Sequence, residues 1–179
     1  MAAVTPDLHI VTYEELKPVL DVLVGLPDHV PWVELSSIVD RLGWTLRTAG
    51  VGRTTLPVNL TMFMAGGMNM EDGSRELVSV DFLVSDTLYD GSKASWKRAV
   101  ERAFPVMRDV VSRILGFEPT RERPWGLPGS TWDLPKPRGG QVDLLRGQSS
   151  LTVYVQAEWV TDLELAQIRH GRPFDDGLR

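Results

Sequence analysis

The segment LVSVDFLVSDTLYDGSKASWKRAVERAFPVMRDVVSRILG, residues 77–116, joins a strand pattern to a long helix pattern. From Val78 to Val84 apolar side chains recur at every second position, which is the period of a strand with one buried face. Beyond that strand the spacing changes to three or four residues, the period of a helix with one buried stripe, and a glycine follows the last apolar position. We therefore predict a strand up to Val84 and a helix from Lys93 to Leu115.

A first helix is predicted near the start of the chain. Thr12 and Glu15 have the spacing of a capping box, in which the hydroxyl and the carboxylate each accept a hydrogen bond from a backbone N–H at the helix start. Apolar residues then continue with helical spacing to about Leu26. Pro18 lies inside this segment and lacks a backbone donor, so either the helix kinks there or its regular part begins near Lys17.

Two further helices have recognisable ends. Asp28 is a candidate N-cap for a second helix that ends at Gly43, where a glycine can adopt the left-handed conformation. Near the C-terminus, Thr161 and Glu164 repeat the capping-box spacing and predict a short helix that ends at Gly171.

Strand patterns occupy most of the region between the second helix and the long one. Alternating apolar residues predict a strand over 56–64, with a shorter strand at 44–46 before it. The stretch AGGMNMEDGS, residues 65–74, is interpreted as the loop that leads into the strand ending at Val84.

The chain after the long helix begins with a segment rich in proline and glycine. Residues 118–140 contain five prolines and are interpreted as a connection with little regular structure, interrupted by a short strand at 131–134. Alternation at 142–144 and again over 151–159 predicts a final hairpin that turns at 147–149.

Together these elements predict an α+β protein. We expect a mainly antiparallel sheet of five to six strands with the long helix packed on it, two N-terminal helices and a short C-terminal helix. Short links between consecutive strands favour antiparallel pairing, because parallel neighbours require a long crossover. A chain of 179 residues is expected to form a single domain, residues 1–179.

The sequence lacks the residues for several common chemistries. It has no cysteine and only three isolated histidines, so disulfides and thiolate sites are excluded and no metal is expected. It contains no phosphate-binding loop, no GxGxxG motif and no GxSxG motif, so we expect no cofactor, no catalytic residues and no enzymatic activity. No membrane-spanning run and no signal-peptide pattern occurs, which predicts a cytoplasmic protein without membrane contact.

Charge is divided along the chain. Residues 1–92 carry 13 acidic and 5 basic side chains, a net charge of −8, whereas residues 93–146 have a net charge of +5. An acidic surface attracts a basic partner through long-range electrostatics, and the alternative is a solvated rim that maintains solubility. The basic segment is interpreted as pairing within the fold and not as a nucleic-acid interface, because no binding motif accompanies it. The acidic residues close to the strand ending at Val84 are Glu71, Asp72, Glu76, Asp86 and Asp90.

Six tryptophans are a second notable feature of the composition. Trp32, Trp96 and Trp159 fall on apolar stripes and are expected in the core. Trp125 lies in the proline and glycine loop ERPWGLPG, where its ring either plugs the core or is presented to a partner as an anchor.

Several short motifs resemble those of a known family. LGW at 42–44, LGFEPT at 115–120, STWDLP at 130–135 and SLTVYVQAEW at 150–159 resemble a family of small actinobacterial proteins without assigned activity. The resemblance covers about the last two thirds of the chain. Proteins of this kind resemble the immunity proteins of polymorphic toxin systems in size, composition and lack of catalytic motifs, and the order of elements is similar to a secretion-chaperone-like fold. The motifs hold core and turn residues, so the resemblance implies no functional residue.

The predicted function is non-enzymatic binding of a protein partner, such as a basic toxin domain that an immunity protein neutralises by direct contact. A secretion chaperone or adaptor is the alternative within the binding class. A third hypothesis is a small enzyme whose site assembles from distant residues. The candidate partner-binding residues are Glu71, Asp72, Glu76, Asp86, Asp90 and Trp125.

Overall fold

The computed structural model describes residues 7–44, 48–50, 53–56, 66–70, 76–123 and 126–169. The helical elements are α1 (Tyr13–Val24), the 3₁₀ turn η1 (Trp32–Glu34), α2 (Leu35–Arg41), α3 (Lys93–Leu115) and α4 (Glu158–Arg169). The strands are β1 (Thr48–Gly50), β2 (Arg53–Leu56), β3 (Gly66–Met70), β4 (Leu77–Leu83), β5 (Arg121–Glu122), β6 (Gly129–Asp133), β7 (Gln141–Arg146) and β8 (Leu151–Gln156). None of the described helices combines the length and apolarity that crossing a bilayer requires.

All strands of the described residues form one antiparallel sheet in the order β1-β2-β3-β4-β8-β7-β6-β5. Five strands have five to seven residues, while β1, β2 and β5 at the two edges have two to four. The central pair is β4 with β8, which are far apart in the sequence because α3 and the β6–β7 hairpin are inserted between them. The predicted α+β class, with its mainly antiparallel sheet, is confirmed.

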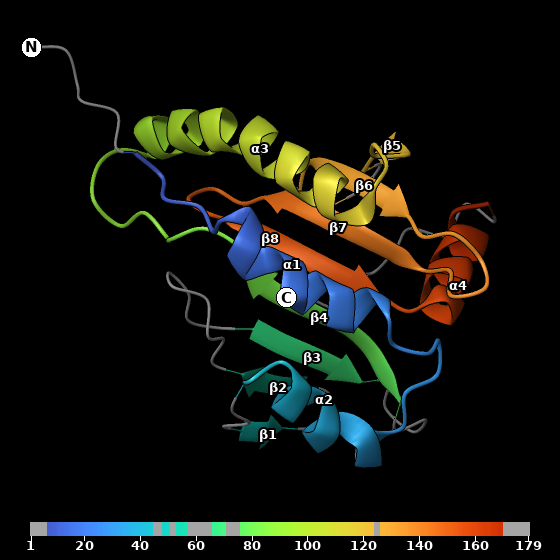
Figure 1. Ribbon diagram of the computed structural model, residues 1–179. Coiled ribbons are helices and arrows are strands. Elements are labelled where there is room, and N and C mark those ends of the chain that lie inside the picture. Colours follow the sequence, from blue (N-terminus) through green and yellow to red (C-terminus); the bar gives the residue numbers. More distant parts are fainter. Residues whose placement is uncertain are drawn as a thin grey trace, which may run out of the picture.

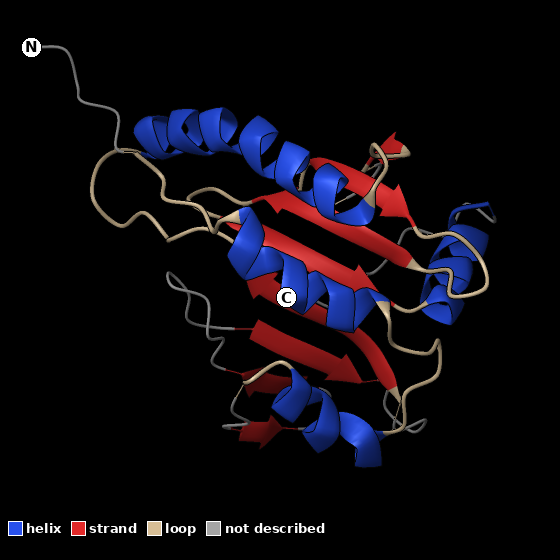
Figure 2. Cartoon of the chain, viewed as in Figure 1, coloured by secondary structure: helices blue, strands red, loops and turns tan. Residues whose placement is uncertain are grey.

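Helices α1, α2 and α3 lie over one face of the sheet (Figure 1; Figure 2). Their apolar sides and one side chain from every second position of the central strands form a single core. In β7, for example, Val142 and Leu144 face the helices while Asp143 between them faces the other way. The largest side chains that are fully buried include Trp132, Phe82, Leu16, Leu20, Leu23 and Met107.

Several local predictions are confirmed. The long helix spans Lys93–Leu115 as expected, begins at an N-cap on Ser92 and ends at Gly116, which has φ of +83°. The Thr12–Glu15 capping box is present and starts α1, and this helix continues through Pro18. The predicted final hairpin is formed by β7 and β8.

The interpretation of residues 65–74 as a loop is wrong. Gly66–Met70 forms strand β3, which pairs with β4 on one side and with β2 on the other. Two glycines give this segment little strand propensity, so the hydrogen bonds of its two neighbours hold it in the sheet. The predicted strand over 56–64 lies outside the described residues except for Leu56, the last residue of β2.

Two predicted N-caps are also wrong: Thr161 for the C-terminal helix and Asp28 for the second helix, whose N-cap is Glu34. Helix α4 begins three residues before Thr161, whose hydroxyl donates to the carbonyl oxygen of Ala157 within the first turn. Asp28 caps this helix instead of a helix of its own: its Oδ1 accepts from the backbone N–H groups of Glu158 at 2.6 Å and Trp159 at 3.3 Å. Sequence spacing does not reveal this cap because cap and helix are 130 residues apart.

The tryptophans are distributed differently from the prediction. Trp96 and Trp159 are only partly buried, whereas Trp44 and Trp132 are enclosed in the core; the side chain of Trp32, also expected in the core, lies outside the described part of the structure. Trp96 lies at the first turn of α3, where its Nε1 donates to the carbonyl oxygen of Asp90 at 2.9 Å. Trp96 does continue the apolar spacing of the helix, but the first turn of α3 extends beyond the sheet, so no described strand covers the ring there (Figure 1).

Candidate functional site

The sheet face turned away from α1, α2 and α3 carries rows of polar side chains. One row runs across four neighbouring strands as Thr131, Asp143, Tyr154 and Asp81, which are register partners. Such rows arise because side chains alternate between the two faces of a strand. The second row is Asp133, Gln141, Gln156 and Ser79.

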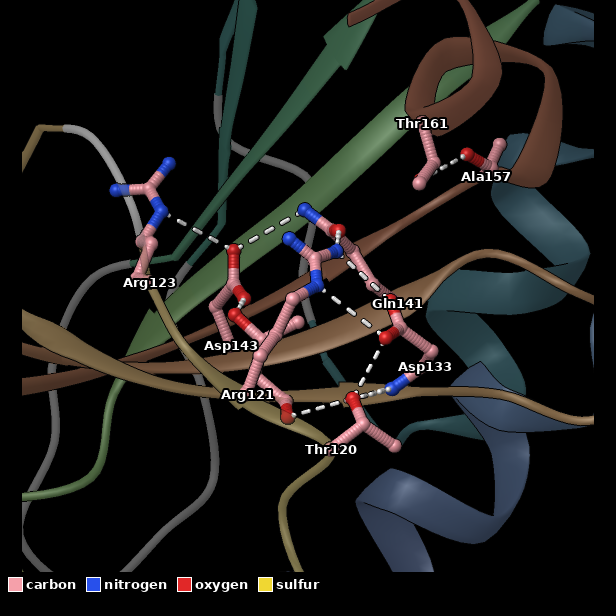
Figure 3. Close-up of polar contacts among 9 residues, drawn as sticks. Thr120, Arg121, Arg123, Asp133, Gln141, Asp143, Ala157 and Thr161 are labelled. Carbon is pink, nitrogen blue, oxygen red and sulfur yellow. Dashed lines mark hydrogen bonds and ion pairs between the residues drawn. The ribbon is translucent and has the colours of Figure 1, made fainter. Parts of the chain in front are cut away.

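Asp143 lies at the centre of these rows and its side chain is fully buried. Thr131 Oγ1 donates to Asp143 Oδ1 at 2.5 Å, and Gln141 Nε2 donates to Oδ2 at 3.2 Å. Arg123 Nε forms an ion pair with the same Oδ2 at 3.3 Å (Figure 3). Both carboxylate oxygens are therefore occupied by groups of this chain.

A second carboxylate on the next strand is engaged in the same way. Arg121 binds Asp133 through two donors, with Nη2–Oδ1 at 2.7 Å and Nε–Oδ2 at 3.2 Å, and the Nη2 also donates to Gln141 Oε1 (Figure 3). Thr120 Oγ1 donates to Asp133 Oδ2 at 2.6 Å. This ion-pair network joins the edge strand β5 and its neighbour β6 to β7.

The two carboxyl groups differ in acidity. Burial raises the pKa of Asp143, although the hydrogen bond from Thr131 and the charge of Arg123 act in the opposite direction. Partial burial acts to raise the pKa of Asp133 too, but hydrogen bonds from Arg121 and Thr120 outweigh it and lower that pKa. Carboxyl pairs with separated pKa values are typical of acid–base catalysis. Here every oxygen of the two carboxylates accepts a hydrogen bond from a side chain of this protein.

The loop that follows β4 is exposed over residues 89–92. The loop over residues 84–92 is bound to the N-terminal segment, since Asp86 N–H donates to the His9 carbonyl oxygen at 3.1 Å and His9 N–H donates to Asp86 Oδ1 at 3.1 Å. It is also bound to the β7–β8 turn, because Leu88 N–H donates to the Ser149 carbonyl oxygen at 3.0 Å. We call residues 84–92 the tyrosine loop.

The second half of the tyrosine loop is held by the start of α3. Trp96 donates to the carbonyl oxygen of Asp90, and Ser92 with Ser95 forms a reciprocal cap. Gly91 between them has φ of +109°, and a Cβ there would lie 2.9 Å from Ser95 Oγ. This turn therefore requires glycine.

Tyr89 projects from this constrained loop with 81% of its surface exposed. Its neighbours Leu88 and Asp90 are the ones whose backbone groups are bound to Ser149 and Trp96. Sequence reasoning missed this residue. The cluster of aspartates and glycine around it marks a loop, and a tyrosine in such a loop has little opportunity to reach the core.

The predicted partner-binding residues do not all come together. Asp86 and Asp90 lie in the tyrosine loop, whereas Glu76 precedes the first residue of β4, so a strand of roughly 20 Å separates them. Glu76 is engaged by His29, with 2.8 Å between Oε2 and Nδ1. Glu71, Asp72 and Trp125 lie outside the described residues.

His29 connects three elements at this opposite end. Its ring pairs with Glu76, lies 3.7 Å from the Oδ2 of Asp28 through Nε2, and stacks on Trp159 with ring centroids 6.2 Å apart. The hydrogen bond that His29 makes to the Glu76 carboxylate raises the pKa of His29, and the charges of Glu76 and Asp28 add to this effect. When it is protonated, the ring links the residue before β4 to the residue that caps α4.

We expect replacement of His29 by glutamine to destabilise the protein more at low pH than at high pH. A raised folded-state pKa means that the stabilisation is complete below the unfolded value of about 6.5 and is lost as the pH rises through the folded value. Urea unfolding of both proteins at about pH 5.5 and about pH 9 checks this. An equal difference between the two proteins at both pH values would contradict the role of the charged ring.

A cavity of about 20 Å³ lies between the end of α1 and strands β4 and β8, with Asp28, Arg138 and Gln156 in its lining. This is space for one water molecule and not for a metabolite. Within the described part of the chain, no three histidine or carboxylate side chains are grouped so that they could hold a metal ion.

Comparison with known proteins places the chain in a family. The chain belongs to the family of unknown function DUF6301, which it matches over residues 15–157. This range begins in α1 and ends just before α4, so it includes the whole described sheet, the tyrosine loop and the ion-pair network. No curated protein and no solved structure matched the chain.

Proposed function

We propose that this protein is a non-enzymatic, cytoplasmic binding protein and that it acts as an immunity protein, neutralising a cognate toxin by direct contact. The observation that carries the proposal is the tyrosine loop, a constrained segment that exposes 81% of Tyr89 next to Asp90. Tyrosine is among the residues that contribute most to protein interfaces, because a large ring with few rotatable bonds loses little entropy on binding.

The constraint on the loop strengthens this interpretation. Association costs free energy for every segment that must be ordered, so a loop already held on both sides of its aromatic residue binds at a lower cost. The net charge of −8 over residues 1–92 adds long-range attraction for a basic partner. The resemblance to small actinobacterial proteins and to toxin immunity proteins supports the choice of partner class.

The ion-pair network supports the absence of catalysis in this proposal. Asp143 and Asp133 are two described carboxylates with shifted pKa values, and both are bound by arginine and threonine side chains. A catalytic acid or base needs an oxygen within hydrogen-bonding reach of a substrate. In this proposal the two residues stabilise the sheet edge and take no part in chemistry.

The experiment is to mix the purified protein with the toxin domain encoded beside its gene. We expect a stable complex by size-exclusion chromatography and loss of the toxin's activity at stoichiometric protein. The association rate should fall as salt is raised, because steering between exposed charges is screened. Finding neither a complex nor inhibition would remove this proposal.

A further inference from the structure

We infer that the tyrosine loop is a docking surface for an arginine of the partner, whose guanidinium stacks on the ring of Tyr89 and pairs with the carboxylate of Asp90. This inference rests on the proposed binding function and names the chemistry of its contact. It commits to a basic protein segment that contains arginine, and it distinguishes arginine from lysine.

The ring of Tyr89 and the carboxylate of Asp90 are both accessible to a partner. Tyr89 is 81% exposed, and Asp90 beside it is exposed as well. Among the described residues, no basic side chain forms an ion pair with Asp90, and its backbone carbonyl is the group that Trp96 binds. The ring and the carboxylate are therefore both presented to solvent by adjacent residues of one constrained turn.

Two other aromatic rings of the chain have an arginine stacked on them. The guanidinium of Arg113 lies 4.7 Å from the centroid of the Tyr13 ring, and that of Arg146 lies 4.7 Å from the centroid of the Phe104 ring. The half-buried ring of Tyr13 and the buried ring of Phe104 are thus each covered by an arginine of this chain. No described guanidinium lies over Tyr89, so a partner's arginine would complete the same contact there.

Charge and shape favour arginine over other partners. A planar guanidinium can stack on an aromatic face and donate to a carboxylate at the same time, whereas an ammonium group is a compact, strongly hydrated charge. Asp86 adds a further negative charge in the same loop, with Oδ1 bound to His9 N–H. Lys93, at the first position of α3, is the basic residue nearest in sequence to Asp90; its charge would attract a phosphate, whereas the charges of Asp86 and Asp90 repel one.

The test uses two peptides, nine arginines and nine lysines, titrated into the full-length protein at low salt. Amide chemical shifts should change at residues 86–91 with the arginine peptide, which should bind more tightly than the lysine peptide. Tyr89→Ala should weaken binding of the arginine peptide about two- to fivefold, which is what one exposed cation–π contact contributes, while Tyr89→Phe should change the affinity less than twofold. Asp90→Asn should also weaken binding of the arginine peptide.

Matched controls remove similar groups elsewhere. Val33 is 82% exposed on η1, so Val33→Ala removes an equally exposed apolar side chain, and Asp40→Asn removes one exposed carboxylate from α2. Both controls should bind the arginine peptide as the wild type does. Shift changes confined to another surface, equal binding of the two peptides, or an unchanged Tyr89→Ala variant would each overturn the inference.

The outcome separates this inference from the proposed function. A protein that inhibits its toxin but shows no arginine-dependent shifts at residues 86–91 is a binding protein with a different contact. A protein that binds the arginine peptide at Tyr89 but forms no toxin complex has the docking surface and a different biological partner.

Discussion

Replacing Trp132 by alanine is expected to destabilise the protein by about 4 kcal/mol, the largest effect of any single substitution considered. The side chain is fully buried on β6, and its Nε1 donates to Ser112 Oγ of α3 at 3.3 Å. Truncation to alanine removes a large apolar surface from the core and leaves a cavity that the surrounding helix and sheet can only partly close.

Urea unfolding followed by circular dichroism measures this loss. Ser112→Ala is the matched control for the hydrogen bond, because it leaves the ring in place, and should cost about 1 kcal/mol. If Trp132→Ala does not fold, Trp132→Phe keeps most of the volume and should give a smaller loss. A Trp132→Ala variant within about 1 kcal/mol of wild type would show that the ring is not the centre of the core.

Replacing Asp143 by alanine is expected to cost about 3 kcal/mol, because it leaves the partly buried guanidinium of Arg123 without its counter-ion. Thr131 and Gln141 lose an acceptor in the same step. Asp109→Ala, which removes an exposed carboxylate from α3, is the control and should be close to neutral.

A double variant separates a structural role of this ion pair from a functional one. Combining Asp143→Leu with Arg123→Met removes both charges together, and hydrophobic replacement of a buried pair is commonly near neutral for stability. We expect this variant to be more stable than Asp143→Ala and to retain wild-type toxin inhibition. A stable double variant that loses inhibition would show that the network contributes to function, and it would favour the hypothesis of an assembled site.

The sequence was informative wherever a structure depends on neighbouring residues. The helix Lys93–Leu115 was predicted with both ends correct, because its apolar stripe and its terminal glycine are local features. The Thr12–Glu15 box was correct for the same reason, since cap and helix lie three residues apart. Alternation likewise predicted the antiparallel β7–β8 hairpin.

Predictions failed where a distant segment supplies the hydrogen bonds. Strand β3 contains Gly66 and Gly67 and reads as a loop, yet it pairs with β4 in register from Gly66 to Asn69, with a register shift before Met70. Asp28 reads as a cap for the helix that follows it, yet its carboxylate binds the first N–H groups of α4. In each case a backbone group is satisfied by a partner that sequence spacing does not reveal.

The features of the candidate site also fall into those that depend on neighbouring residues and those that depend on distant ones. The α+β class, the excess of acidic residues in the first half and the position of Asp86 and Asp90 beside the strand ending at Val84 can be deduced from the order of residues. The exposure of Tyr89 between two anchored neighbours and the enclosure of Asp143 by Arg123 and Thr131 become visible in the folded molecule. Periodicity and charge are properties of the chain alone, whereas exposure and pairing depend on which strands and turns the folded sheet brings together.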